Sequence, residues 1–151
     1  MKFEYINTIH CTEQEAWDLV MDFERRGEWI HFIEKTKWVE KKDNLVGSTY
    51  TEKLVFLGIP LHIQYIVEEY SDKKLIRTHS KMPPFYPVVD VTLSKDKNKK
   101  GVDCGLIFDI SLGPLALIPK SIIKKQVDQL IQPLVDEFIS ILESESSLRT
   151  S

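Results

Sequence analysis

The chain has 151 residues, of which 42% are hydrophobic and 28% are charged, as is ordinary for a soluble globular protein. A single domain of this length buries about 68–70% of the surface that its unfolded chain exposes, and we expect residues 1–151 to form one domain. The net charge of −3 at pH 7 excludes a global positive field, so we expect no binding to nucleic acid.

The termini and the cysteines indicate where the chain acts. No apolar run is long enough to cross a bilayer, so we expect no stable membrane insertion. Residues 1–11 alternate between polar and apolar types and lack the apolar core of a signal peptide. Cys11 and Cys104 make no disulfide framework, and we interpret both as reduced, partly buried side chains. These features together predict a cytoplasmic location.

The first part of the chain predicts a strand and two short helices. Polar and apolar residues alternate over 2–9, which is typical of a strand. Thr12 and Glu15 then have the spacing of a capping box, in which each side chain accepts a hydrogen bond from the backbone amide of the other residue. The helix that begins there is expected to end near 22–24. Gly27 separates it from a second short helix over 28–33.

Strand patterns dominate the middle of the chain. They cover residues 36–41, 48–57, 59–70, 75–80, 88–94 and 102–112. The intervening segments are short turns, apart from a stretch with three prolines over 82–87 that cannot be a regular strand. Consecutive strands with short connections favour an antiparallel meander, and strand twist curves a sheet of this size.

The last third of the chain predicts one long amphipathic helix. Within 120–144, apolar residues recur at steps of three and four, and the opposite face is polar. The apolar face carries Ile123, Val127, Leu130, Leu134, Phe138 and Ile141. Helices at both ends of a strand-rich chain indicate the α+β class. A straight helix across a curved sheet touches it only in part, so we expect a cavity between them, which is the usual form of a small-molecule site.

The opening of the chain resembles a known superfamily. The run Cys11-Thr12-Glu13-Gln14-Glu15-Ala16-Trp17, followed by Met21-Asp22-Phe23 and Glu28-Trp29, is similar to the start of START-like, Bet v 1-like (SRPBCC) proteins. That superfamily includes the polyketide cyclase/dehydratase and lipid-transport group. The resemblance covers nearly the whole chain and implies a helix-grip fold. In such a fold a curved antiparallel sheet of six to seven strands wraps around a long C-terminal helix, and two short helices follow the first strand.

The resemblance also implies a deep apolar cavity for lipids, steroids, polyketides or quinones. Its walls would be the second short helix, the concave sheet face, the loops over the mouth and the last helix. By position, the implied ligand-binding residues are Trp29, Phe32, Tyr50, Phe56, Tyr65, Phe85, Tyr86, Phe108, Val127, Leu130 and Leu134. The family shares no catalytic triad, so the resemblance transfers no catalytic residue.

Glu52 is a further candidate for this site. It shares one face of the strand 48–57 with apolar residues, and Lys53 lies on the other face, so either inward face places a charge among apolar neighbours. If Glu52 faces inward, burial raises its pKa and it could act as a general acid. The alternative is a carboxylate at the rim or paired with a cation. Arg77 and His79 could pair with Glu52 or bind a ligand carboxylate, or they line the solvated convex face.

The sequence leaves three functions open. The four histidines and two cysteines lack the spacing of a metal site, and we expect neither a metal nor a cofactor. The first hypothesis is a non-enzymatic protein that binds or transports a hydrophobic small molecule, such as a lipid, polyketide or quinone, between sheet and C-terminal helix. The alternatives are a polyketide cyclase/dehydratase-type enzyme with unknown catalytic residues, and a protein-interaction module with an unknown partner.

Overall fold

The computed structural model describes residues 1–96, 98 and 100–150, apart from the side chains of 114 and 146–150. The elements are β1 (Lys2–Ile9), α1 (Glu13–Met21), η1 (Phe23–Arg25), α2 (Arg26–Trp29), β2 (Ile33–Glu40), β3 (Thr49–Phe56), β4 (Ile59–Ser71), β5 (Leu75–His79), β6 (Val88–Ser94), β7 (Val102–Asp109), η2 (Gly113–Leu115) and α3 (Lys120–Thr150). The strands form one antiparallel sheet in the order β1-β7-β6-β5-β4-β3-β2. The predicted meander is therefore confirmed.

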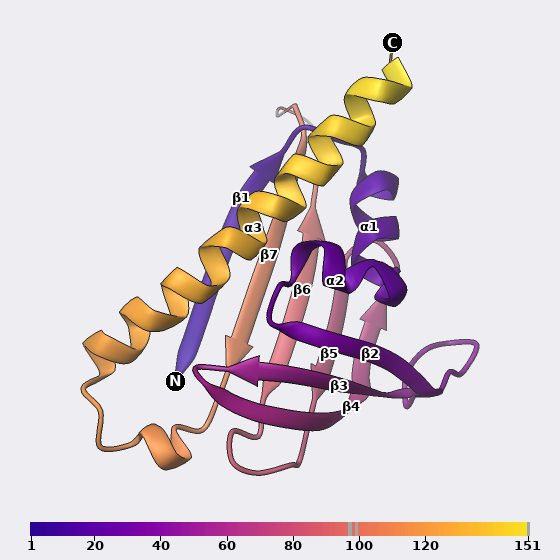
Figure 1. The fold of residues 1–151 in the computed structure, drawn as a ribbon. Coiled ribbons are helices and arrows are strands. Elements are labelled where there is room, and N and C mark those ends of the chain that lie inside the picture. Colours follow the sequence, from indigo (N-terminus) through magenta and orange to yellow (C-terminus); the bar gives the residue numbers. More distant parts are fainter. Residues whose placement is uncertain (97, 99, 151) are drawn as a thin grey trace.

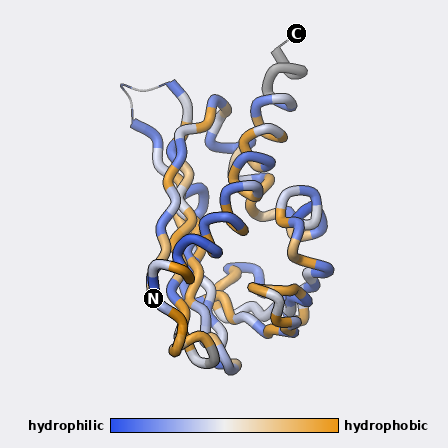
Figure 2. Tube along the Cα trace, turned by 60° about the vertical axis from the view of Figure 1, so that its left-hand side comes forward, coloured by the Kyte–Doolittle hydropathy of each residue, from blue (hydrophilic) through white to orange (hydrophobic). Residues whose placement is uncertain are grey.

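The sheet curves around α3, which crosses one of its faces diagonally, and α1 and α2 lie on that same side (Figure 1). Apolar and polar residues alternate along the strands in Figure 2, as expected for a sheet with one face against a core and the other in water. This arrangement is the helix-grip fold, and its prediction is confirmed. Within the described part of the chain, no helix has both the length and the apolar character needed to cross a bilayer.

The capping box at the start of α1 has the predicted geometry. The Thr12 hydroxyl accepts a hydrogen bond from the Glu15 amide, and the Thr12 amide donates to Glu15 Oε1, both at 3.1 Å. The second short helix is α2, which spans Arg26–Trp29 instead of the predicted 28–33 and contains Gly27. One glycine costs a helix only about 1 kcal/mol relative to alanine. Contacts of the buried Trp29 offset that cost.

The last helix is longer than predicted, and part of its buried face is shifted by one residue from the predicted face. It continues past the predicted end at residue 144 to Thr150, with Pro133 inside it. Leu130 and Ile141 are only partly buried, and Ile131 and Leu142 take their places in the core. Both sets have helical spacing, so the sequence period alone did not distinguish them.

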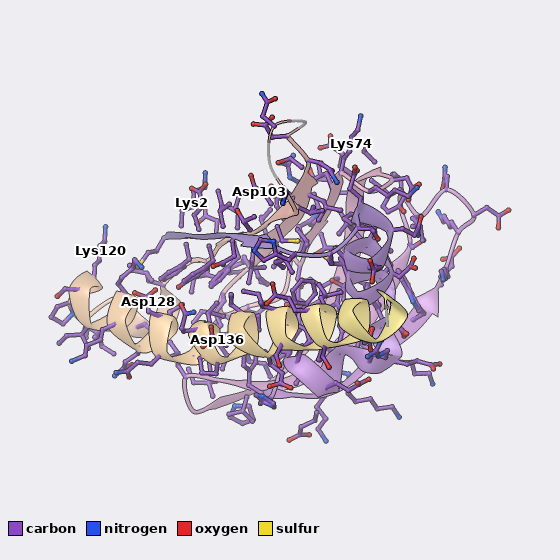
Figure 3. The ribbon with its side chains drawn as sticks, turned by 90° about the horizontal axis from the view of Figure 1, so that it is seen from above. Lys2, Lys74, Asp103, Lys120, Asp128 and Asp136 are labelled. Atoms are coloured by element: carbon purple, nitrogen blue, oxygen red, sulfur yellow. The ribbon has the colours of Figure 1, made fainter. Side chains whose placement is uncertain are left out.

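One contact ties α3 to the edge strand of the sheet. The Tyr5 hydroxyl on β1 donates to Oδ1 of Asp128 at 2.6 Å, and Asp128 is labelled on α3 in Figure 3. Lys124 Nζ also lies 2.7 Å from the same carboxylate oxygen. Because these groups are far apart in sequence, their contact fixes where the first half of α3 lies on the sheet.

The inward face of β3 is the one that carries Glu52. Tyr50, Glu52, Leu54 and Phe56 are all buried, whereas the Lys53 side chain is 66% exposed. On the neighbouring β4 the buried residues include Ile63 and Tyr65, which lie directly opposite Glu52 and Tyr50. The alternation of β3 and β4 therefore brings one carboxylate and two phenols into an otherwise apolar interior.

Candidate functional site

A cavity of about 150 Å³ lies between the inner face of the sheet, α2 and α3. Its helical wall consists of Arg26 and Trp29 from α2 and Ile131 and Leu134 from α3. The remaining wall comes from the segment 30–32, from β2 to β7 and from the proline-rich segment before β6. An engineered apolar cavity of about 150 Å³ holds one benzene molecule. The cavity is thus large enough for a single aromatic ring.

Nine of the twelve residues predicted for the site line this cavity. They are Trp29, Phe32, Tyr50, Glu52, Phe56, Tyr65, Phe85, Phe108 and Leu134. The other three do not line it. Val127 is fully buried in the core, and Leu130 is half-buried because α3 turns Ile131 inward in its place. Tyr86 is 51% exposed, since the chain turns at this residue with a φ of 45° and points Phe85 inward instead.

Several lining residues were not predicted, and Arg26 is the most important of them. It follows another arginine in a short helix, and nothing in its sequence context distinguishes it from a surface residue. The sequence did indicate that a carboxylate facing the interior would need a cation as its partner. It did not indicate which of the several arginines, lysines and histidines would reach Glu52.

The polar end of the cavity is built around a buried ion pair. Arg26 Nη1 lies 2.6 Å from Glu52 Oε2, and the Thr36 hydroxyl donates to the same oxygen at 3.0 Å. The two charged side chains are 12% and 7% exposed. Burial opposes the charge of Arg26, but the neighbouring Glu52 carboxylate raises the Arg26 pKa above its usual value. The guanidinium also lies 3.7 Å from the centre of the Phe23 ring, where the ring face attracts a cation.

Glu52 is therefore paired with a cation, which is one of the two alternatives expected for it. Its partner is Arg26 and not Arg77 or His79. Arg77 binds Asp90 and Glu69 instead, and His79 Nδ1 lies 3.2 Å from Glu68 Oε2. Neither Arg77 nor His79 lines the cavity.

Two tyrosines lie beside the ion pair. The rings of Tyr50 and Tyr65 are stacked, with centroids 5.0 Å apart and planes 18° apart. The Tyr50 hydroxyl donates to Thr78 Oγ1 at 3.2 Å. Burial raises the pKa of Tyr50 to about 12 and that of Tyr65 well above its ordinary value. Both phenols are thus neutral near pH 7 and can donate a hydrogen bond.

None of the two cysteines and four histidines of the chain lines the cavity. The described residues hold no group of three or more His, Cys, Asp or Glu side chains that could bind a metal ion. Cys11 and Cys104 are free thiols. Burial raises the pKa of Cys11 to about 11 and that of Cys104 to about 12, which favours the protonated thiol over the nucleophilic thiolate near pH 7.

The fold has clear counterparts among solved structures. A START superfamily protein from Mycobacterium smegmatis matches with a TM-score of 0.79 at 12% identity, over 95% of this chain and 97% of that one. The protein TTHA0849 from Thermus thermophilus matches with a TM-score of 0.77 at 12% identity, over 97% and 99%. The structure of Ara h 8.0201 gives 0.66 at 13% identity, over 95% and 98%.

Comparison of the sequence gives no match to a family model and none to a curated protein. The structural matches have low identity, so they show a shared fold and nothing finer. Function must accordingly be argued from the cavity itself.

Proposed function

We propose, from the START-like, Bet v 1-like fold of this chain, that it binds or transports a hydrophobic small molecule such as a lipid, a polyketide or a quinone. The observation that carries the proposal is the cavity of about 150 Å³ between the sheet and α3. Cores normally pack without voids of this size, and a concave apolar space with a few polar groups is the usual form of a ligand site.

The lining favours an apolar guest. Away from Arg26, Glu52, the two tyrosines and Thr78, the lining side chains are aliphatic or aromatic. Burial of a guest's apolar surface contributes about 25 cal/mol per Å². A guest larger than one ring must extend beyond the cavity or displace part of its wall, which on the helical side consists of α2 and α3.

A second candidate function is an enzyme of the cyclase/dehydratase type, and one feature favours it. Glu52 Oε2 is held by Arg26 and Thr36, but Oε1 has no hydrogen-bond partner among the residues that the structure describes and is not fully buried. A carboxylate oxygen with free capacity in an apolar cavity could take a proton from a bound compound. A carrier releases its guest unchanged, whereas an enzyme converts it.

Native mass spectrometry of the protein purified from its own host tests the proposal. We expect a co-purifying apolar compound whose mass is the same before and after incubation with the protein. Leu134→Trp, which places an indole in the cavity, should abolish the complex. Ile122→Trp is the matched control, because Ile122 lies on α3 but is 46% exposed, and it should leave the complex intact. The carrier proposal fails if no compound co-purifies and no apolar compound in a broad screen raises the melting temperature.

A further inference from the structure

We propose that the Tyr65 hydroxyl is the group that selects the guest, and that the guest carries a neutral oxygen, such as a ketone, ester or alcohol, which accepts a hydrogen bond from it. This inference rests on the proposed binding function and adds the chemical class of the ligand. It derives from the hydrogen-bonding state of the polar groups in the cavity wall.

Tyr65 is fixed in place and directed inward. It lies in the middle of β4 directly opposite Tyr50, is 6% exposed and lines the cavity. The stacked Tyr50 ring restrains its orientation. No other described residue forms a hydrogen bond with its hydroxyl, yet that oxygen is not fully buried. Because Tyr65 is otherwise enclosed and lines the cavity, we infer that its hydroxyl oxygen faces the cavity.

The other hydrogen-bond donors in the cavity wall are either already paired or too deeply buried to reach a guest. The Tyr50 hydroxyl donates to Thr78 Oγ1, so both of these hydroxyls are engaged. Arg26 donates through Nη1 to Glu52 and also bonds the Tyr50 side chain. Nε of Arg26 and Nε1 of Trp29 have no partner in the described part of the chain, but both atoms are fully buried and offer nothing to a guest. Tyr65 combines an unpaired donor with access to the cavity. A guest oxygen in the cavity could accept the hydrogen bond that no described protein group takes from this hydroxyl.

The charges around Tyr65 favour a neutral oxygen over a carboxylate. Burial is the main cause of its raised pKa, and the Glu52 carboxylate raises that pKa further than Arg26 lowers it. The charge of Arg26 is already neutralised by Glu52 at 2.6 Å. An anionic guest would therefore find no unpaired cation at this end, and only apolar side chains elsewhere, where a charge has no compensation.

Three probes of similar size test the inference: ethylbenzene, acetophenone and benzoate, titrated calorimetrically into wild type and Tyr65→Phe. Loss of the hydroxyl should weaken the binding of acetophenone about threefold to tenfold, the range of one neutral hydrogen bond. The affinity for ethylbenzene should not change. Benzoate should bind more weakly than acetophenone to wild type. Tyr86→Phe is the matched control: Tyr86 is 51% exposed and does not line the cavity, so loss of its hydroxyl should leave the ratio of the acetophenone and ethylbenzene affinities unchanged.

An infrared measurement on wild type provides a readout that needs no variant. The carbonyl stretch of bound acetophenone should fall below its value in a hydrocarbon solvent, because the oxygen accepts a hydrogen bond. If ethylbenzene binds but Tyr65→Phe leaves acetophenone unaffected and the stretch is unshifted, the role of Tyr65 is refuted and the binding function stands. Benzoate binding as tightly as acetophenone refutes the preference for a neutral guest. If none of the three probes binds wild type, the binding function itself is contradicted.

Discussion

Replacing Glu52 by alanine is expected to lower the free energy of unfolding by about 3–5 kcal/mol, because breaking a buried ion pair leaves one charge uncompensated. The Arg26 side chain is only 12% exposed. It would keep its position over the Phe23 ring but lose its carboxylate, and Thr36 would lose its acceptor. Urea denaturation at pH 7, followed by circular dichroism, measures the effect.

Two controls separate the lost pairing from the lost side chain. The double variant with Arg26→Met and Glu52→Leu removes both charges and should be within about 1 kcal/mol of wild type or more stable, as for other buried pairs replaced by apolar residues. Glu34→Ala breaks the exposed pair with Lys53 at 3.7 Å and should change stability by less than about 1 kcal/mol. If Glu52→Ala is no worse than Glu34→Ala, the pair does not have the structural role assigned to it.

Replacing Phe138 by alanine is expected to destabilise the protein by about 3–5 kcal/mol, the usual range for a buried aromatic ring. Phe138 is 7% exposed and packs on Trp29 with ring centroids 4.8 Å apart. This contact joins α3 to α2 beside the cavity, so its loss should loosen α3 along with the core. Urea denaturation followed by tryptophan fluorescence reports both the stability and the environment of the indoles.

Ile122→Ala is the comparison for this variant, because it truncates an apolar side chain on the exposed side of the same helix. It should change the free energy of unfolding by less than about 0.5 kcal/mol. Equal effects of Phe138→Ala and Ile122→Ala would mean that the second half of α3 is not anchored through Phe138. The helix could then not serve as a fixed wall of the cavity.

Features that depend on local periodicity could be predicted from the sequence. The capping box of Thr12 and Glu15 is a contact between near neighbours, and the alternation along β3 and β4 follows from the two-residue period of strands. The meander needed only short connections between such strands. For α3, the period was right but the buried face was displaced, with Ile131 replacing Leu130, because two sets of apolar residues satisfy one helical spacing.

The candidate site was harder to predict because tertiary contacts decide it. Most aromatic residues that the resemblance implied do line the cavity, but the resemblance did not indicate that the loop before β6 turns Phe85 inward and Tyr86 outward. The pairing of Glu52 with Arg26 joins residues from α2 and β3, and no spacing in the chain indicates it. Whether a hydroxyl such as that of Tyr65 finds a partner depends on atoms contributed by several elements.

The most direct test of an apolar binding cavity is a titration of the methyl-labelled protein with toluene, followed by NMR. The account predicts chemical-shift changes at the methyl groups that line the cavity, among them Ile63, Ile76, Ile131 and Leu134. The exposed methyl groups of Ile6 and Leu117, with 59% and 98% of their surface in solvent, should not respond. Shifts confined to those exposed residues, or no shifts at saturating toluene, would contradict the account.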